Sequence, residues 1–455
     1  MSDAEFPDAW YLILSSRLIP DLDGGYTISA LARARQMTGA GAPPLLLTVD
    51  PGAVAAHAAH RATFVERGAA SASEIFRNLF DEAVASAGGA ADWLREAAHG
   101  GHADPSLEYR DVAGGAVSLP VIVDPDWHLT RAPIVIRDTT GETVGVVDGF
   151  GALYRAWLSR IASDLRAENA RPVVLICESR QLGELLVGWG DDDVRIVHTV
   201  HTIHLEPPYR ADSPLNSLWS RWFEIASRFD AVLWPTVQQR DDVRERFGTA
   251  ANDLVVPHAV AAPATTVPAA DRDPGRVVVL GRLAPGKRLA QAVRAFGRVR
   301  ADVPEVRLEL WGEGAQRAEL EALIDELDLR EVVSLPGLTT DPGAVLDGAA
   351  VYLTTSAFEG QGLAMAEALA HGTPVVAWDI RYGPRDMLAR GGGILVPDGD
   401  EDALVAALVG ILTDADTRER LSAEALEAAT TMSPARTMQA LAAAARETLA
   451  RPRRR

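Results

Sequence analysis

The chain has 455 residues, enough for two or three domains of ordinary size. Its 44 Lys and Arg side chains against 63 Asp and Glu give a formal net charge of −19, which argues against a general nucleic-acid-binding protein. The single cysteine, Cys177, excludes a disulfide within the chain and a cysteine-rich metal site.

The two ends of the sequence bear on where the protein acts. Met1–Trp10 carries Asp3, Glu5 and Asp8, the wrong charge for a secretory leader, and no apolar run reaches the ~18–20 residues of a membrane span. We therefore expect a cytoplasmic protein. The basic tail, Arg451 to Arg455, is expected to be frayed and solvated, with peripheral contact at the inner membrane face as the alternative.

The first elements read as a βαβ unit. An apolar strand, Trp10–Ser15, is followed by the turn Asp23-Gly24-Gly25, a helix over Thr27–Thr38 and a strand within Pro44–Val49. Residues 52–100 are Ala-rich and are predicted to be mostly helical.

Residues 107–150 differ and predict an antiparallel, β-rich insert. Short β-type runs alternate with Gly-containing turns: Tyr109–Val112, Val117–Asp124, Ile134–Asp138 and Thr143–Asp148.

The α/β pattern then resumes and repeats after a linker. Three strands, a helix and a further strand are predicted over Val173–Cys177, Arg195–Thr199, Ala231–Trp234, Gln238–Phe247 and Asp253–Val256. Ala261–Asp273 has little periodicity and is the best linker in the chain. A second set of strands is expected at Val277–Leu280, Arg307–Trp311, Val332–Leu335, Ala350–Thr354, Pro374–Ala377 and Gly393–Val396.

This order predicts an α/β protein of two Rossmann-like domains that face a cleft. The predicted boundaries are 1–262 for the N-terminal, acceptor-side domain and 263–432 for the C-terminal domain that binds the nucleotide-sugar donor. Residues 433–455 are predicted to form a helix that returns to the N-terminal domain, followed by the basic tail.

The strongest chemical signal follows the predicted strand Ala350–Thr354. Glu359, Gly360, Gln361 and Gly362 precede a helix that starts at Leu363 and carries Glu367 two turns in. A Gly-rich turn at a helix N-terminus presents free backbone N–H groups and suits a diphosphate, while the two carboxylates suit sugar and ribose hydroxyls. The alternative is a plain turn flanked by solvated glutamates.

Two further loops fall at carboxyl ends of the same predicted sheet. Gly281 and Arg282, with Lys287 nearby, place two cations where a leaving diphosphate would gain negative charge. Gly312 and Gly314 flank Glu313 after the next strand, a pattern that is weak when taken alone. No G-x-G-x-x-G follows the first strand, which disfavours a nicotinamide dehydrogenase.

These motifs together resemble the retaining glycosyltransferase family 4, which has the GT-B fold. The resemblance covers Arg276 to Leu412 and implies that Arg282 and Lys287 contact the donor diphosphate, Glu359 the transferred sugar and Glu367 the ribose. Gln361 stands where the family usually has an aromatic residue.

A finer match lies in Asp379–Asp386, which contains Tyr382 and Gly383, two residues predicted to bind the donor. It resembles a branch of the family that includes poly(glycerol-phosphate) and poly(ribitol-phosphate) α-glycosyltransferases of teichoic acids. The branch also includes the catalytic subunit that adds N-acetylglucosamine to serine-rich adhesins. Relatives in this branch carry a β-rich insert that aids oligomerisation or acceptor binding, so a homo-oligomer is expected.

Histidines follow the strand Arg195–Thr199 of the N-terminal half. His198, His201 and His204 recur at period three, and the branch carries a similar motif. His201 is predicted to lie near the reacting sugar, with His204 next to it, and His198 to be structural. Gly24 and Gly25 resemble the family's first Gly-rich loop, and Glu178-Ser179-Arg180 lies where acceptor contacts are expected.

The resemblance implies front-face displacement with retention, in which the leaving phosphate deprotonates the acceptor hydroxyl. We expect no metal or other cofactor, because two cations serve the diphosphate and no Asp-x-Asp motif lies near the donor loops. The predicted donor is a UDP-sugar carrying a hexose or N-acetylhexosamine, and the predicted acceptor is a phosphopolyol polymer. A protein or small-molecule acceptor and a non-catalytic GT-B binding protein remain the alternatives.

Overall fold

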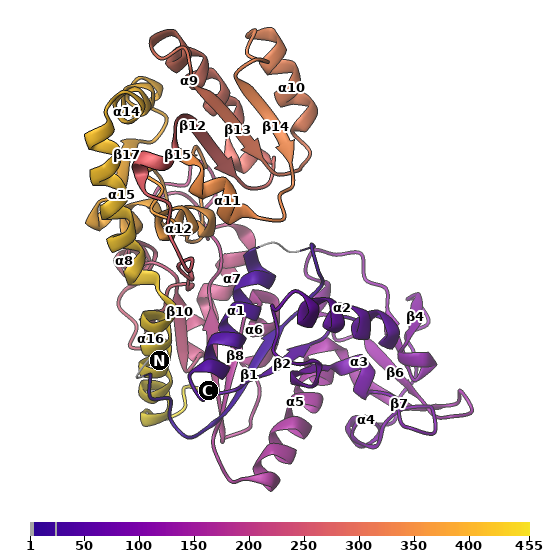
Figure 1. Ribbon diagram of the computed structural model, residues 1–455. Helices are drawn as coiled ribbons and strands as arrows, with labels where there is room; N and C mark the ends of the chain where they lie inside the picture. The colour runs from indigo at the N-terminus through magenta and orange to yellow at the C-terminus, as the bar shows by residue number, and fades with distance from the viewer. Residues whose placement is uncertain (1–3, 23–24) are drawn as a thin grey trace.

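The computed structural model describes residues 4–22 and 25–455, which form two parallel α/β sheets and a smaller antiparallel sheet (Figure 1). The N-terminal sheet has seven strands in the order β11-β10-β9-β8-β1-β2-β3. Their bounds are β1 Trp10–Ser15, β2 Leu45–Thr48, β3 Phe76–Asn78, β8 Val173–Cys177, β9 Val194–Thr199, β10 Ala231–Trp234 and β11 Asp253–Val255.

The C-terminal sheet has six parallel strands in the order β14-β13-β12-β15-β16-β17. They are β12 Asp273–Leu280, β13 Arg307–Trp311, β14 Val333–Gly337, β15 Ala349–Thr354, β16 Val375–Asp379 and β17 Gly393–Pro397. The predicted linker therefore extends one residue too far at its C-terminal end, because Asp273 already pairs with Ala349.

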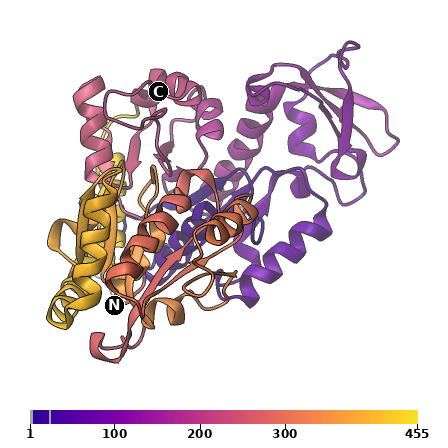
Figure 2. The same cartoon turned by 90° about the horizontal axis from the view of Figure 1, so that it is seen from above.

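The predicted insert is a four-stranded antiparallel sheet, β4-β5-β6-β7. Its strands are β4 Tyr109–Val112, β5 Val117–Pro120, β6 Pro133–Arg137 and β7 Thr143–Asp148. It lies on the side of the N-terminal half away from the helices of the C-terminal sheet (Figures 1 and 2).

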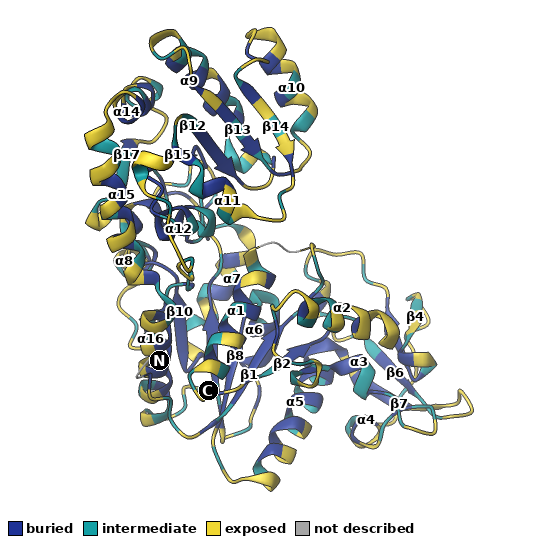
Figure 3. Ribbon diagram, in the orientation of Figure 1, coloured by how far each residue is buried: buried dark blue, intermediate teal, exposed yellow. Residues whose placement is uncertain are grey.

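Helices cover both faces of the two parallel sheets, as right-handed crossover connections require. Buried positions concentrate in the strands and in the inward faces of the helices (Figure 3). The α-helices of the N-terminal half are α1 Gly25–Gly39, α2 Val54–Glu66, α3 Leu79–Glu82, α4 Asp92–Ala97, α5 Gly149–Glu168, α6 Arg180–Leu186, α7 Ser217–Ile225 and α8 Val237–Phe247. Those that follow are α9 Leu289–Asp302, α10 Arg317–Glu326, α11 Pro342–Asp347, α12 Leu363–Ala370, α13 Pro384–Met387, α14 Glu401–Thr413, α15 Ala415–Ala429 and α16 Pro434–Ala450.

Three local predictions need correction. The stretch 52–100 is not mostly helical, because α2, α3 and α4 fill less than half of it. It also contains the edge strand β3, which at three residues is too short to show a period. The predicted strand Val117–Asp124 ends at Pro120. The basic tail is not frayed: Arg455 is buried and lies 2.9 Å from Asp230, with which it forms an ion pair.

The last helix, α16, packs on the N-terminal half of the chain. Met438, Leu441 and Ala442 lie in one buried apolar cluster with residues of β1 and α1, such as Ile13 and Leu31. Figure 1 shows α16 beside the amino end of the chain. The residue boundaries of the domains, 1–262, 263–432 and 433–455, stay a prediction.

A buried charged cluster lies where β2 and β3 end. His57 is held by two carboxylates, Asp50 at 3.1 Å from Nε2 and Asp81 at 2.7 Å from Nδ1. The hydrogen bonds to Asp50 and Asp81 outweigh burial and raise the pKa of His57 to about 9.

This raised pKa predicts a pH-dependent contribution to stability. A group whose folded pKa is raised stabilises fully below its unfolded pKa of about 6.5, and that contribution is lost as pH rises through about 9. We expect His57→Gln to lower the melting temperature by on the order of 2 °C at pH 6 and by less at pH 10. The exposed His102→Gln is the control, and an equal loss for His57→Gln at both pH values would contradict the prediction.

Candidate active site between the two domains

The donor-side loops gather at the carboxyl ends of neighbouring parallel strands. β12 leads into Gly281 and Arg282, and β13 leads into Gly312. A Cβ on Gly312 would lie 1.9 Å from the carbonyl oxygen of Gly281, and one on Gly314 would lie 2.3 Å from that of Leu283. These two glycines therefore let the loop after β13 pack directly against the loop that carries Arg282.

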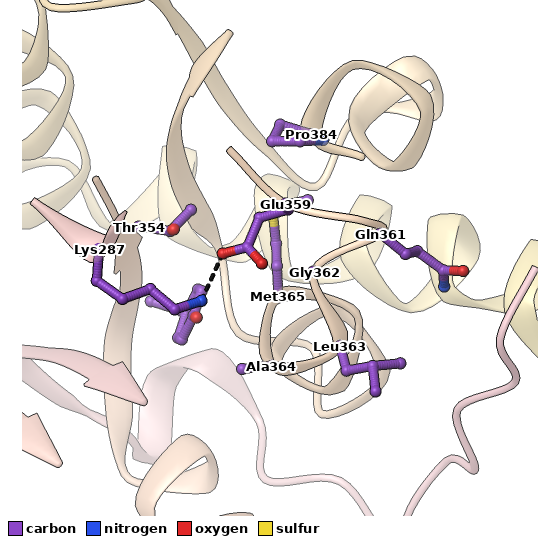
Figure 4. A pocket seen from close by; sticks show the side chains of 10 residues that line it. Lys287, Thr354, Glu359, Gln361, Gly362, Leu363, Ala364, Met365 and Pro384 are labelled. Carbon is purple, nitrogen blue, oxygen red and sulfur yellow. Dashed lines mark hydrogen bonds and ion pairs between the residues drawn. The ribbon is translucent and has the colours of Figure 1, made fainter. Parts of the chain in front are cut away.

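Lys287 and Glu359 meet at the centre of this group. The Lys287 Nζ donates a hydrogen bond of 2.6 Å to Oε1 of Glu359 (Figure 4). Ser356 Oγ donates a second hydrogen bond of 2.6 Å to the same oxygen. An ammonium group has three N–H donors, so Lys287 keeps donors for an incoming anion. Arg282 is exposed and has no ion pair among residues 4–22 and 25–455.

The N-terminus of α12 faces the same spot. Gly362 adopts φ 94° and no side chain caps the helix, so the first backbone N–H groups of α12 lack a side-chain partner. Gly362, Leu363 and Ala364 line a hollow of about 30 Å³ together with Lys287 and Glu359 (Figure 4). Free N–H groups and the positive end of the helix dipole favour an anion there.

Glu367 lies on α12, one turn beyond Ala364, which lines this hollow. Burial raises the pKa of its carboxyl group, and no ion pair links it to a residue that the structure describes. A half-buried carboxyl group without a partner is suited to accept hydrogen bonds from ligand hydroxyls.

The N-terminal domain contributes His201 from beyond the end of β9. Gly360 approaches it so closely that an added Cβ would lie 2.1 Å from the carbonyl oxygen of His201. Gly25, at the start of α1, also faces the donor side, since a Cβ there would lie 3.5 Å from Leu363 Cδ1. Gly24 lies outside the described residues.

His204, Tyr382 and Gly383 join the domains instead of lining the hollow. The ring of His204 stacks on that of Tyr382 at 5.9 Å, and burial lowers the pKa of His204 to about 3. A Cβ on Gly383 would lie 1.8 Å from the Gln361 carbonyl oxygen, so this glycine packs against the donor loop. Across the same boundary, Arg381 Nε donates to Asp242 at 2.5 Å.

Gln361 lines the hollow, but its side chain points away from Lys287 and Glu359 (Figure 4). Its Oε1 accepts a hydrogen bond of 2.7 Å from the backbone N–H of His258, and its Nε2 donates one of 3.0 Å to the His258 carbonyl. The residue that departs from the family pattern is therefore tied to the segment that joins the two domains.

Sequence reasoning missed Arg288, which shapes the donor loop. Its guanidinium lies 4.4 Å from the ring centre of Trp378 and donates to the carbonyl oxygens of Thr355 and Ser356. The position of Arg288 directly after Lys287 was the one sequence feature that pointed to it. Spacing alone does not reveal that Arg288 bonds to Thr355, which lies 67 residues further along the chain. Glu178, expected among acceptor contacts, is instead fully buried, which corrects that expectation.

A second and larger cavity of about 720 Å³ lies between the N-terminal sheet and the insert. Loops that follow β1 and β2 form one side of it, including Ser16 and Asp50, and Arg110 and Pro120 of the insert form another. Aromatic side chains complete the lining: Phe80, Trp127, Phe150 and Tyr154.

Comparison with known proteins identifies the class of the C-terminal half. Residues 266–428 match the family described as "Glycosyl transferases group 1", and this segment is a domain of that family. The chain is similar to the poly(glycerol-phosphate) alpha-glucosyltransferase of Bacillus subtilis, at 29% identity over 51% of this chain and 34% of the relative. It is also similar to the GtfA subunit of a peptide N-acetylglucosaminyltransferase of Streptococcus gordonii, at 28% identity over 46% of this chain and 43% of the relative.

These alignments therefore span less than half the length of either relative. Solved structures match over nearly the whole chain. A mutant form of TarM from S. aureus, in complex with fondaparinux, alpha-GlcNAc-glycerol and UDP, has a TM-score of 0.73 at 16% identity, covering 96% of this chain and 99% of that one. The pneumococcal O-GlcNAc transferase GtfA, in complex with UDP and GlcNAc, has a TM-score of 0.69 at 17% identity, covering 97% and 100%. The predicted GT-B fold is thus confirmed, and the relatives named here are of the kinds expected from the predicted branch.

The described residues also bear on metal binding and on membrane insertion. The described ranges 4–22 and 25–455 hold no group of three or more His, Cys, Asp or Glu side chains placed to bind a metal ion. No helix in that same part of the chain is long and apolar enough to cross a membrane.

Proposed function

We propose that the chain transfers a hexose or N-acetylhexosamine from a UDP-sugar to a phosphopolyol acceptor of the teichoic-acid type, with retention of configuration. The observation that carries the proposal is the Lys287–Glu359 pair at the uncapped N-terminus of α12, beside the exposed Arg282. The similarity to the poly(glycerol-phosphate) alpha-glucosyltransferase supports the choice of acceptor.

The chemistry follows from the groups at this spot. The bond between the anomeric carbon and the β-phosphate oxygen breaks, and negative charge grows on the diphosphate between Arg282, Lys287 and the N–H groups of α12. The acceptor hydroxyl attacks the same face of the sugar and gives its proton to the departing phosphate oxygen. Glu359 and Glu367 would hold sugar and ribose hydroxyls. No step requires a metal ion.

The larger cavity supports an acceptor that extends away from the donor. It opens at the carboxyl ends of β1 and β2, the same edge of the sheet from which His201 extends after β9. Arg110 is exposed there and suits a phosphodiester, while the exposed Trp127 offers a flat face to a polyol or sugar. A homo-oligomer and peripheral membrane contact stay predictions.

Donor hydrolysis by the purified protein tests the proposal. UDP-glucose, UDP-N-acetylglucosamine, UDP-galactose and GDP-sugars are compared, with and without EDTA. We expect slow, selective release of UDP from one donor, unchanged by EDTA and lost in Glu359→Gln. No turnover and no binding of any donor would instead favour a non-catalytic GT-B protein.

Transfer assays then separate the acceptors. The selected donor is offered with poly(glycerol-phosphate), with poly(ribitol-phosphate) and with a Ser/Thr-rich peptide. Product on the peptide alone would replace the phosphopolyol proposal by the protein-acceptor alternative, which the similarity to the GtfA subunits favours. The anomeric configuration of the product, read by NMR, tests retention.

A further inference from the structure

A buried ionic network stands behind His201. Glu178 comes directly after β8, and Arg33 lies on α1; both side chains are buried. Arg33 Nε lies 3.1 Å from Oε1 of Glu178, and His201 Nε2 lies 2.6 Å from Oε2. Each carboxylate oxygen therefore has its own partner, one on each side.

The charge state of Glu178 decides which nitrogen of His201 carries a proton. Burial raises the pKa of Glu178, but Arg33 and His201 outweigh burial and lower it to about 2, so the carboxylate is ionised. An ionised carboxylate only accepts hydrogen bonds, so His201 Nε2 must be the donor. In the neutral imidazole ring, Nδ1 is then the acceptor nitrogen left to meet a ligand hydroxyl, as none of the described residues bonds to it.

Two aromatic contacts fix the plane of the His201 ring. The His258 ring stacks on it at 4.9 Å with an interplanar angle of 8°, and Tyr26 meets it edge-on at 5.2 Å. The backbone of His258 is in turn held by both ends of the Gln361 amide. The donor loop therefore acts on the face of this imidazole through His258, while the buried carboxylate acts on its Nε2.

We propose that Glu178, held by Arg33, is a positioning residue that fixes the Nε2–H tautomer of His201 and presents Nδ1 to the hydroxyl groups of the substrates. This inference rests on the proposed function, because it assumes that His201 meets the sugar or the acceptor. Glu178 itself contacts no substrate, since the protein covers it completely.

The variant Glu178→Gln tests the proposal with almost no change in volume. An amide carries no charge and has one acceptor oxygen, so it loses the ion pair with Arg33 and can turn its N–H donor toward His201. We expect kcat for donor turnover to fall between about tenfold and 100-fold, while KM for the donor changes little. If Glu178 acts through His201, adding Glu178→Gln to His201→Ala lowers kcat no further.

A spectroscopic measurement reads the tautomer without relying on turnover. ¹⁵N-histidine labelling gives ring-nitrogen shifts for 10 histidines, and His201 is assigned by its absence in His201→Ala. We expect a protonated Nε2 and an unprotonated Nδ1 in the wild type, and a shift toward Nδ1 protonation in Glu178→Gln. Failure of the proposed function would abolish turnover in the wild type but leave this pattern intact.

The matched control is Asp230→Asn, which alters another buried carboxylate paired with an arginine. Asp230 directly precedes β10 and so lies at the amino ends of the strands of the same sheet, whereas Glu178 lies at their carboxyl ends. It forms an ion pair with Arg455. Melting curves must show that both variants are folded. An Nδ1–H tautomer in the wild type, or a loss of kcat in Glu178→Gln that is equal in Asp230→Asn or additive with His201→Ala, would overturn the proposal.

Discussion

Replacing Lys287 with alanine is expected to lower kcat for sugar transfer on the order of 100- to 1000-fold. The ammonium group lies 2.6 Å from Glu359 at the N-terminus of α12, where the leaving diphosphate gains charge. A fixed cation there stabilises the transition state more strongly than it stabilises the bound donor. The KM for the donor should therefore change less than kcat. A steady-state assay with the donor selected above measures both.

Lys287 is the only lysine in the chain, which makes this prediction unusually easy to check. Reductive methylation with ¹³C-formaldehyde should label two kinds of amine, Lys287 and the α-amino group of the chain. We expect the Lys287 signal to shift on addition of UDP and to vanish in Lys287→Ala.

The matched control for this variant is Arg298→Ala. Arg298 is an exposed cation on α9 that pairs only with Asp402 among residues 4–22 and 25–455. It should keep wild-type kcat. A Lys287→Ala protein that retains more than about a tenth of the wild-type kcat would contradict the assignment of Lys287 to the leaving group.

Replacing Gly360 with alanine is expected to lower kcat about 100-fold with little loss of stability. The added Cβ would lie 2.1 Å from the carbonyl oxygen of His201, which is backbone and has no room to yield. The two domains would have to separate locally at this contact. Glu359 and His201 would then move apart, and the substrates held between them would lose the alignment that the reaction needs.

Small-angle X-ray scattering and kinetics check this second result. We expect the Gly360→Ala protein to have a slightly larger radius of gyration and a melting temperature close to that of the wild type, because the contact lies between domains and not in a core. Gly410→Ala is the control, since a Cβ there meets nothing within 4 Å. Unchanged kcat in Gly360→Ala would mean that this close approach is not needed for catalysis.

The sequence determined the elements of this protein and the order of its chemical motifs. Alternation of strands and helices is visible because parallel strands such as β8 and β15 are buried on both faces and read as continuous apolar runs. The donor motif can also be recognised in the sequence, because Glu359, Gly362 and Glu367 lie on one turn and the helix that follows it. Their spacing along the chain therefore reflects their spacing in the structure.

Only the tertiary structure decided which of these residues share a site. From the sequence, His204 and Tyr382 are both predicted to bind ligands, although they lie far apart along the chain. In the structure their rings stack on each other, because the two domains meet there. The sequence places Glu178 in a loop, but the strand ends of its own sheet and α1 bury it beside Arg33. Sheet order and the contact between the domains decide which side chains become neighbours. Neither of these produces a period or a spacing that could be recognised in the sequence.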